Sequence, residues 1–252
     1  MDLGLRDRVY LVTGGSAGLG LATAQVLVSD GARVVLSARD ADRLTRAADR
    51  LGADLAHAVQ ADNSDPGAPA RLIGAARERF GRLDGALIST GGPPYGTAMQ
   101  TTEADWRAAF ETVFLGTVRL ARAVGSEVGA GGSIALVLSS SVRSPIASLA
   151  ISNGLRPGLA GFAKTLADEL GPAGIRVNGL LPGRIDTDRV RELDARRGDP
   201  DQARAAGSLA IPLGRYGTPE EFGRVAAFVL SPAASYLTGV MVPVDGGALR
   251  VI

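Results

Sequence analysis

Short apolar segments alternate with segments of helical periodicity along the whole chain. The apolar segments are mostly unbroken and too short for a helix, which is typical of strands that are buried on both faces of a sheet. The predicted strands span Arg8–Thr13, Arg33–Ala38, Leu55–Gln60, Gly85–Ser89, Ser133–Ser139, Arg176–Leu181 and Val240–Val244.

The segments between these strands carry apolar residues at spacings of three and four, which predicts amphipathic helices. One predicted helix presents a single apolar stripe made of Trp106, Phe110, Val113, Phe114, Leu120 and Val124. Another presents a stripe made of Leu155, Leu159, Phe162, Leu166 and Leu170. Pro157 lies inside the second helix, where it removes a backbone hydrogen bond, so we expect a late start or a kink there.

Strands that alternate with helices predict βαβ crossovers. The expected fold is therefore α/β and Rossmann-type, with a doubly wound, parallel, seven-stranded sheet and helices on both of its faces.

Composition and charge exclude several classes of function. Hydrophobic residues make up 46% of the chain, charged residues 21%, and the net charge is +1. We therefore expect one globular domain over residues 1–252 and no nucleic-acid partner, because a balanced charge offers no attraction to a phosphate backbone. The chain has no cysteine and one histidine, His57, which excludes disulfides and any thiolate or multi-histidine metal site.

The amino-terminal residues indicate where the protein is located in the cell. Charges at Asp2, Arg6 and Asp7 interrupt the apolar core that a signal peptide needs, and no run approaches the length of a membrane span. We therefore expect a cytoplasmic protein with no membrane partner.

Residues 186–207 are polar and rich in arginine, and we interpret them as a helical, mobile flap over a cleft.

A glycine-rich turn, Thr-Gly-Gly-Ser-Ala-Gly-Leu-Gly over residues 13–20, directly follows the first predicted strand and opens a helix. Glycines in this strand–turn–helix context let the backbone approach a diphosphate, which then binds the unpaired N–H groups of the helix N-terminus. The turn therefore predicts a dinucleotide site formed by Gly14, Ser16, Gly18, Leu19 and Gly20.

The ends of the next two strands indicate which dinucleotide binds. Arg39 follows the second strand, where an acidic residue favours NAD and an arginine favours NADP. Its guanidinium matches a phosphate, so we expect NADP(H) to be preferred over NAD(H); a solvent-exposed arginine at a strand end is the alternative. Asp62, just past the third strand, either accepts a hydrogen bond from the adenine amino group or is only a turn residue.

The turn at residues 13–20 resembles the TGxxxGxG motif of the short-chain dehydrogenase/reductase family. Further segments resemble family segments in the same order, namely Ser133–Ser141, Gly174–Asn178, Leu181–Gly183, Gly214–Glu221 and Val244–Gly247. The chain is similar in particular to 3-oxoacyl-carrier-protein reductases. The resemblance implies an oxidoreductase for a small-molecule carbonyl/alcohol pair, assembled as a homotetramer or homodimer. It also places a set of residues at the cofactor, with Thr187 on the nicotinamide carboxamide: Thr90, Gly91, Arg156, Pro182, Gly183, Ile185 and Thr187.

The resemblance breaks at the residues that transfer protons in this family. A family Tyr donates a proton to the carbonyl oxygen, a Lys lowers the pKa of that Tyr, and a Ser polarises the carbonyl. The Tyr and Lys positions match Ser152 and Arg156 here. The family's Asn matches Val113, and its Ser is retained as Ser139 or Ser140. A phenol has a pKa of about 10 that can be tuned towards neutrality, and losing a positioned acid forfeits about 10²–10⁴-fold in rate.

Other side chains are candidates for the missing functions. Tyr95, in the glycine- and proline-rich loop after the fourth strand, is a candidate substitute acid or a loop aromatic that packs on its neighbours. The resemblance places Arg143, Arg156 and Arg184 near the cleft, where three guanidiniums suit an anionic substrate. Exposed arginines in an arginine-rich protein are the alternative.

Three functions remain open from the sequence. The first is an NADP(H)-dependent oxidoreductase with an altered proton source. The second is a catalytically deficient nucleotide-binding homologue that acts as a sensor or partner subunit. The third is a lyase or isomerase that uses the same cleft. The glycine turn supports nucleotide binding in all three, and family analogy alone does not decide between them.

Overall fold

The computed structural model describes residues 2–196 and 198–251. Within them, seven parallel strands form one sheet in the order β3-β2-β1-β4-β5-β6-β7. The strands are Val9–Thr13 (β1), Arg33–Ala38 (β2), Ala56–Gln60 (β3), Gly85–Ile88 (β4), Ser133–Val137 (β5), Arg176–Pro182 (β6) and Met241–Val244 (β7). The predicted Rossmann-type fold is confirmed, and no strand boundary differs from the predicted one by more than two residues.

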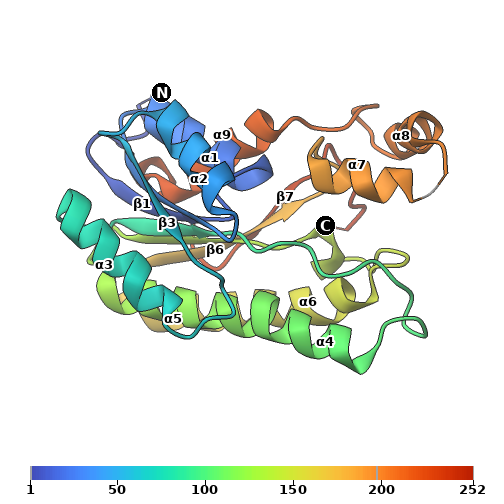
Figure 1. Cartoon of the computed structure of the whole chain (residues 1–252), viewed down its shortest axis with the longest axis horizontal. Coiled ribbons are helices and arrows are strands. Elements are labelled where there is room, and N and C mark those ends of the chain that lie inside the picture. Colours follow the sequence, from blue (N-terminus) through green and yellow to red (C-terminus); the bar gives the residue numbers. More distant parts are fainter. Residues whose placement is uncertain (1, 197, 252) are drawn as a thin grey trace.

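Helices connect the strands and cover the sheet on both faces, with α1, α2 and α9 on one face and α3, α5 and α6 on the other (Figure 1). The α-helices are α1 (Gly18–Ser29), α2 (Ala41–Leu51), α3 (Ala68–Phe80), α4 (Glu103–Ala109), α5 (Gly116–Glu127), α6 (Ala150–Leu170), α7 (Asp188–Ala195), α8 (Pro200–Leu209) and α9 (Pro219–Leu230). Shorter turns are η1 (Phe110–Leu115), η2 (Ser140–Val142), η3 (Gly171–Ala173) and η4 (Pro232–Ala234). No helix in the described residues combines the length and apolar character that a membrane crossing requires.

Side chains of the central strands alternate between two buried cores. In β1, Val9 and Leu11 pack in the core under α3, α5 and α6, whereas Tyr10 and Val12 pack in the core under α1, α2 and α9. Burial raises the pKa of Tyr10 to about 12, and its hydroxyl donates to the Leu230 carbonyl at 3.4 Å. Because both faces are covered, the central strands carry apolar residues on both faces and not only at alternate positions.

The helix predicted from the stripe around Trp106 and Val124 is interrupted by a π-helical segment, η1, between α4 and α5. In a π-turn each hydrogen bond spans one residue more than in an α-helix, which rotates the side chains relative to a regular stripe. Phe110 is consequently 41% exposed and stacks on Phe114, so its prediction as a buried stripe residue is wrong. Val113 is buried, as its place on the stripe predicts.

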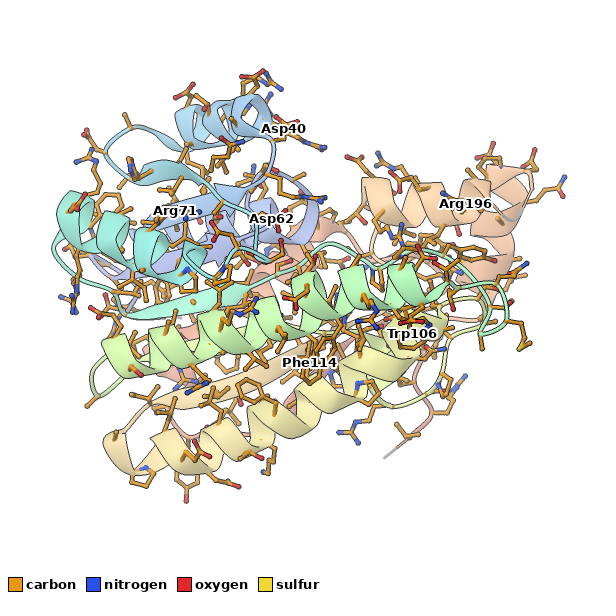
Figure 2. The ribbon with its side chains drawn as sticks, turned by 60° about the horizontal axis from the view of Figure 1, so that its bottom comes forward. Asp40, Asp62, Arg71, Trp106, Phe114 and Arg196 are labelled. Atoms are coloured by element: carbon orange, nitrogen blue, oxygen red, sulfur yellow. The ribbon has the colours of Figure 1, made fainter. Side chains whose placement is uncertain are left out.

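Gly154 and Gly158 on α6 make room for the rings of Trp106 and Phe114, which lie between the α4–η1–α5 helix and α6 (Figure 2). A Cβ at Gly154 would lie 2.7 Å from the Trp106 ring, and one at Gly158 would lie 2.9 Å from the Phe114 ring. These glycines let the two long helices pack closely beneath the carboxyl end of the sheet.

Pro157 does not delay the start of α6, so that alternative is wrong. The helix begins at Ala150 and continues through Pro157 to Leu170. Pro157 is exposed, whereas Ile151, Leu155 and Leu159 on the same helix are buried in the core. Packing of this apolar face supplies the stabilisation that the missing backbone hydrogen bond removes.

The predicted flap, residues 186–207, contains α7 and most of α8, which lie to one side of the layered core (Figure 1, orange). Its predicted helical character is confirmed by the structure; Arg197 lies outside the described residues. Mobility of this segment stays a prediction.

Candidate active site

A groove runs along the carboxyl ends of the parallel strands, where the strand order changes direction between β1 and β4. Ligands bind at such a switch point in open α/β sheets. Two adjoining cavities of about 730 and 750 Å³ form the groove and share Gly14, Arg39, Arg43 and residues 89–93. Every site residue predicted from the sequence lines one or both of them: Gly14, Ser16, Gly18, Leu19, Gly20, Arg39, Asp62, Thr90, Gly91, Tyr95, Ser139, Ser140, Ser152, Arg156, Pro182, Gly183, Ile185 and Thr187. Their functions stay predictions.

The glycine turn forms a cradle of bare backbone at the centre of the groove. Gly14 and Gly18 adopt left-handed conformations, with φ of 61° and 53°, which glycine adopts without strain. A Cβ at Gly20 would lie 2.3 Å from the Gly14 carbonyl oxygen. No side chain caps the N-terminus of α1 and its first turn holds no acidic residue. The helix therefore presents unfilled N–H donors and the positive end of its dipole, which suit a diphosphate.

A reciprocal pair of hydrogen bonds holds the cradle to the neighbouring strand. The Thr13 hydroxyl donates to the Ser89 carbonyl at 2.8 Å and accepts from the Ser89 N–H at 2.9 Å. The Gly15 N–H donates to the Ser37 carbonyl at 3.0 Å. The ends of β1, β2 and β4 are thus joined below the groove.

Two arginines, not one, lie at the end of the groove beside β2. Arg39 is exposed there, as predicted, and Arg43, further along the chain, lines the same cavities. Sequence reasoning missed Arg43, and no helical spacing links it to Arg39, because Arg39 lies before the N-cap of α2. Arg43 pairs with Asp188 of α7 at 2.8 Å.

Asp62 acts as a turn residue in the structure. One carboxylate oxygen accepts from both the N–H and the hydroxyl of Ser64, at 2.8 and 2.7 Å. These hydrogen bonds lower the pKa of Asp62 below its ordinary value. Asp62 also lines the cavity, and its predicted contact with adenine stays a prediction.

Serine hydroxyls cluster at the opposite end of the groove. Ser152 on α6 and Ser141 are both buried, and their Oγ atoms lie 3.2 Å apart, within hydrogen-bond distance. The Ser139 hydroxyl accepts from the Ser141 N–H at 3.1 Å, which leaves its own proton free to donate. Asn153, which sequence reasoning also missed, holds this loop to α6 through two hydrogen bonds with the backbone of Ile146, at 3.0 and 2.8 Å.

Arg156 lies one turn after Ser152 on the same face of α6 and is only 5% exposed. Its guanidinium donates to the Val137 carbonyl and, at 3.5 Å, to the Thr90 hydroxyl, while its buried Nε has no partner. Burial lowers the pKa of Arg156 to about 10, so the side chain remains a cation at neutral pH.

The Tyr95 loop lies beside the start of α6. The Gly96 N–H donates to the Ser148 carbonyl at 2.8 Å, and the Ala150 N–H donates to the Gly96 carbonyl at 3.2 Å. Tyr95 is half-buried and lines the same cavity as Ser152. The fold therefore brings a phenol and the serine cluster to one cleft, although they are far apart in the sequence.

The sequence and fold of this chain match those of known proteins. A family model described as enoyl-(acyl carrier protein) reductase matches residues 14–248. The chain belongs to the short-chain dehydrogenase/reductase family. It is 34% identical to the short-chain reductase protein NovJ of Streptomyces niveus, over 96% of this chain and 94% of NovJ. It is 30% identical to the 3-oxoacyl-(acyl-carrier-protein) reductase FabG of Salmonella typhimurium, over 99% and 100% of the two chains.

A solved structure in the family shows the same fold over its full length. L-sorbose reductase from Gluconobacter frateurii, in complex with NADPH and L-sorbose, matches with a TM-score of 0.91 at 31% identity and covers 100% of both chains. The resemblance inferred from the glycine turn and the later segments is therefore confirmed for the family.

In this short-chain dehydrogenase/reductase, the three arginines predicted near the cleft differ in their surroundings. Arg143 is exposed and is not among the residues that line the groove. Arg184 lines the groove, but it pairs with the buried Asp194 at 2.6 Å and donates to the Tyr216 hydroxyl at 2.9 Å. Only Arg156 lines the cleft as a buried cation without a carboxylate partner among the described residues.

Helix α7, which lies in the predicted flap, contacts both sides of the groove. Arg189 of α7 donates to the Pro93 carbonyl at 2.7 Å, and Asp188 pairs with Arg43 of α2. Thr187, predicted to contact a carboxamide, caps α7 by accepting from the Val190 N–H at 3.4 Å. The short helix α7 therefore joins the β2 end of the groove to the loop after β4.

Proposed function

We propose that this chain is an NADP(H)-dependent oxidoreductase that acts on a carbonyl/alcohol pair of a small molecule and uses a non-standard proton donor. The observation that carries the proposal is the glycine cradle, which opens on a groove with arginines at one end and hydroxyl groups at the other. A dinucleotide needs this order of groups: cations for a ribose phosphate, bare amides for a diphosphate, and polar groups at the reacting ring.

The residues present fit the cofactor. A Cβ at Gly20 would clash with the Gly14 backbone, so the turn packs directly on α1, and the first N–H groups of α1 lack a capping side chain. Arg39 and Arg43 would hold the 2′-phosphate, and the segment 182–187 would border the nicotinamide. When bound, the nicotinamide supplies or accepts the hydride.

The chain's own residues polarise the carbonyl and hold protons. The Ser139 hydroxyl, whose proton is free, would donate to the carbonyl oxygen, where negative charge develops during reduction. Arg156 keeps its proton at neutral pH, so it holds oxygen atoms and does not act as an acid. Tyr95 is the phenol in the cleft and, in this proposal, the proton donor.

Cofactor titration followed by turnover tests the proposal. We expect NADPH to bind at least tenfold more tightly than NADH by fluorescence titration, and we expect carbonyl compounds to oxidise the bound NADPH. Replacing Tyr95 with Phe should lower kcat by about 10²–10⁴-fold, the usual cost of losing a positioned acid. Tyr236→Phe is the matched control, because Tyr236 is fully exposed outside the groove. Equal turnover of the two variants would remove Tyr95 as the donor.

The alternative, a nucleotide-binding homologue without turnover, is favoured by one observation. Ser152, at the position of the family's Tyr, shares a hydrogen bond with Ser141, and an aliphatic hydroxyl is a far weaker acid than a phenol. Tight NADPH binding with no carbonyl-dependent oxidation, and turnover that appears in the double variant Ser152→Tyr with Arg156→Lys, would support this alternative.

We also propose that the protein assembles as a homodimer or homotetramer. The exposed Phe110, stacked on Phe114, offers an apolar surface on the long-helix layer that a second copy would cover. Light scattering on the purified protein tests this, and a monomeric mass would refute it.

A further inference from the structure

Two arginines are buried among the residues that the structure describes, and their surroundings differ. Arg176 and Arg156 are 8% and 5% exposed. An ionised group that is removed from water is costly unless other groups compensate its charge. The partners of each guanidinium therefore indicate whether the charge is satisfied within the fold or is directed to a ligand.

Arg176 is satisfied by the fold. Its guanidinium donates to four carbonyl oxygens, those of Val229, Leu230, Ser231 and Leu237, at 2.8–3.3 Å. These carbonyls lie at and beyond the carboxyl end of α9, where the helix dipole is negative. Arg176 is thus a structural cation that caps a helix.

Arg156 is not satisfied in the same way. It has two neutral acceptors, the Val137 carbonyl and the Thr90 hydroxyl, and its buried Nε has no partner. Neither acceptor lies at the carboxyl end of a helix, so no helix dipole offsets the charge. No carboxylate among the described residues pairs with it.

The other charges that line this cleft are paired, except that of Arg39, which is exposed to solvent at the β2 end of the groove. Arg184 is neutralised by Asp194, and Asp188 is neutralised by Arg43. Arg156 is therefore a net positive charge beside the neutral hydroxyls of the serine cluster. A bound anion would compensate this charge.

We propose that the cleft takes a substrate that carries a carboxylate near its carbonyl or alcohol group, and that Arg156 and the neighbouring Ser152 hydroxyl bind this carboxylate. That the bound molecule is a substrate rests on the proposed function, whereas the anion site itself does not. One guanidinium offsets one negative charge, so a carboxylate fits it better than a phosphate ester, which carries close to two. A carboxylate also accepts a charge-assisted hydrogen bond from the guanidinium and a second bond from a hydroxyl.

Binding of acetate, with acetamide as its neutral analogue, tests the anion site without any turnover. Trp106 is the only tryptophan, and its ring packs on Gly154, between Ser152 and Arg156 on α6, so its fluorescence is a local reporter. Titrations would be made at constant ionic strength, with and without NADP⁺. We expect acetate to bind the wild-type protein at least tenfold more tightly than acetamide.

Variants then assign the site to Arg156. Arg156→Gln should weaken acetate binding by about 10- to 100-fold, the factor for one charge-assisted hydrogen bond, and Arg156→Lys should retain part of the affinity. Arg143→Gln, an exposed arginine on the adjacent loop, should bind acetate as the wild type does. Circular dichroism would confirm that each variant is folded.

Two results would overturn the inference: acetamide that binds wild-type protein as well as acetate does, or folded Arg156→Gln protein with unchanged acetate affinity. The first comparison needs no variant, so misfolding of Arg156→Gln does not leave the question open. Acetate selectivity without any NADPH oxidation would refute the proposed function and leave the anion site intact. NADPH oxidation without acetate selectivity would do the reverse.

Discussion

Replacing Gly20 with alanine probes the backbone cradle directly. The added Cβ would lie 2.3 Å from the Gly14 carbonyl oxygen, 2.8 Å from the Gly14 carbonyl carbon and 3.1 Å from the Thr13 carbonyl oxygen. These are backbone atoms, so no flexible side chain can move aside. Either the turn or the first turn of α1 must shift, and with it the N–H groups that we propose for the diphosphate.

The size of the effect follows from two opposing terms. Inserting a methyl group against a packed backbone costs about 1–3 kcal/mol, whereas alanine gains about 0.5–1 kcal/mol over glycine inside a helix. We expect a net loss of about 0.5–2 kcal/mol in the free energy of unfolding, combining these two terms. Loss of one or two charge-assisted hydrogen bonds should weaken NADPH binding by at least about 10-fold.

Gly74→Ala is the matched control. Gly74 lies inside α3, and a Cβ there would have no atom within 4 Å. This variant should gain about 0.5–1 kcal/mol and bind NADPH normally, since only the helix propensity changes. Urea unfolding and NADPH fluorescence titration measure both quantities. If Gly20→Ala binds NADPH with wild-type affinity, the diphosphate does not lie on this turn and the reasoning is refuted.

Three further predictions concern single side chains. Arg39→Ser should lower the affinity for NADPH by about 10- to 100-fold and leave NADH binding nearly unchanged, because only NADPH carries the 2′-phosphate; paired titrations measure this. Hydrogen bonding to Arg215 lowers the pKa of Glu221 from 4.5 to about 2. Its stabilising contribution is therefore complete above pH 4.5 and is lost as the pH falls towards 2, so Glu221→Gln should flatten unfolding stability over that range. Arg184→Ala should destabilise the protein by about 3–5 kcal/mol in urea unfolding, because Asp194 stays buried without its partner.

Each of these has an outcome that contradicts it. A parallel loss of NADH and NADPH affinity in Arg39→Ser would indicate a structural defect and not a lost phosphate contact. An unchanged pH profile for Glu221→Gln would show that the ion pair with Arg215 does not form in solution. Wild-type stability of Arg184→Ala would mean that water reaches Asp194 through an open flap.

The sheet and the glycine turn were predictable from the sequence because both depend on local patterns. A strand covered on both faces is an unbroken apolar run, and the nucleotide turn is a glycine cluster directly after such a run. The buried place of Val113 followed from its helical stripe. The exposure of Phe110 did not, because the apolar spacing predicts a regular helix and does not mark the π-helical segment that rotates the side chain.

The candidate site was only partly predictable. The sequence by itself determined which residues end the strands at the carboxyl edge of the sheet, and therefore which residues share the groove. It could not show that Arg43 joins Arg39 there, or that Asn153 holds the serine loop to α6. Those contacts depend on how α2 and α6 are seated on the sheet.

Charge compensation was decided by the tertiary structure alone. The sequence alone does not distinguish the charge environments of Arg143, Arg156 and Arg184. In the structure Arg143 is exposed, Arg156 is buried without a carboxylate partner, and Arg184 is neutralised by Asp194. The energy of an ionised group depends on its distance from water and from opposite charges. Those distances are fixed only when segments far apart in the chain come together.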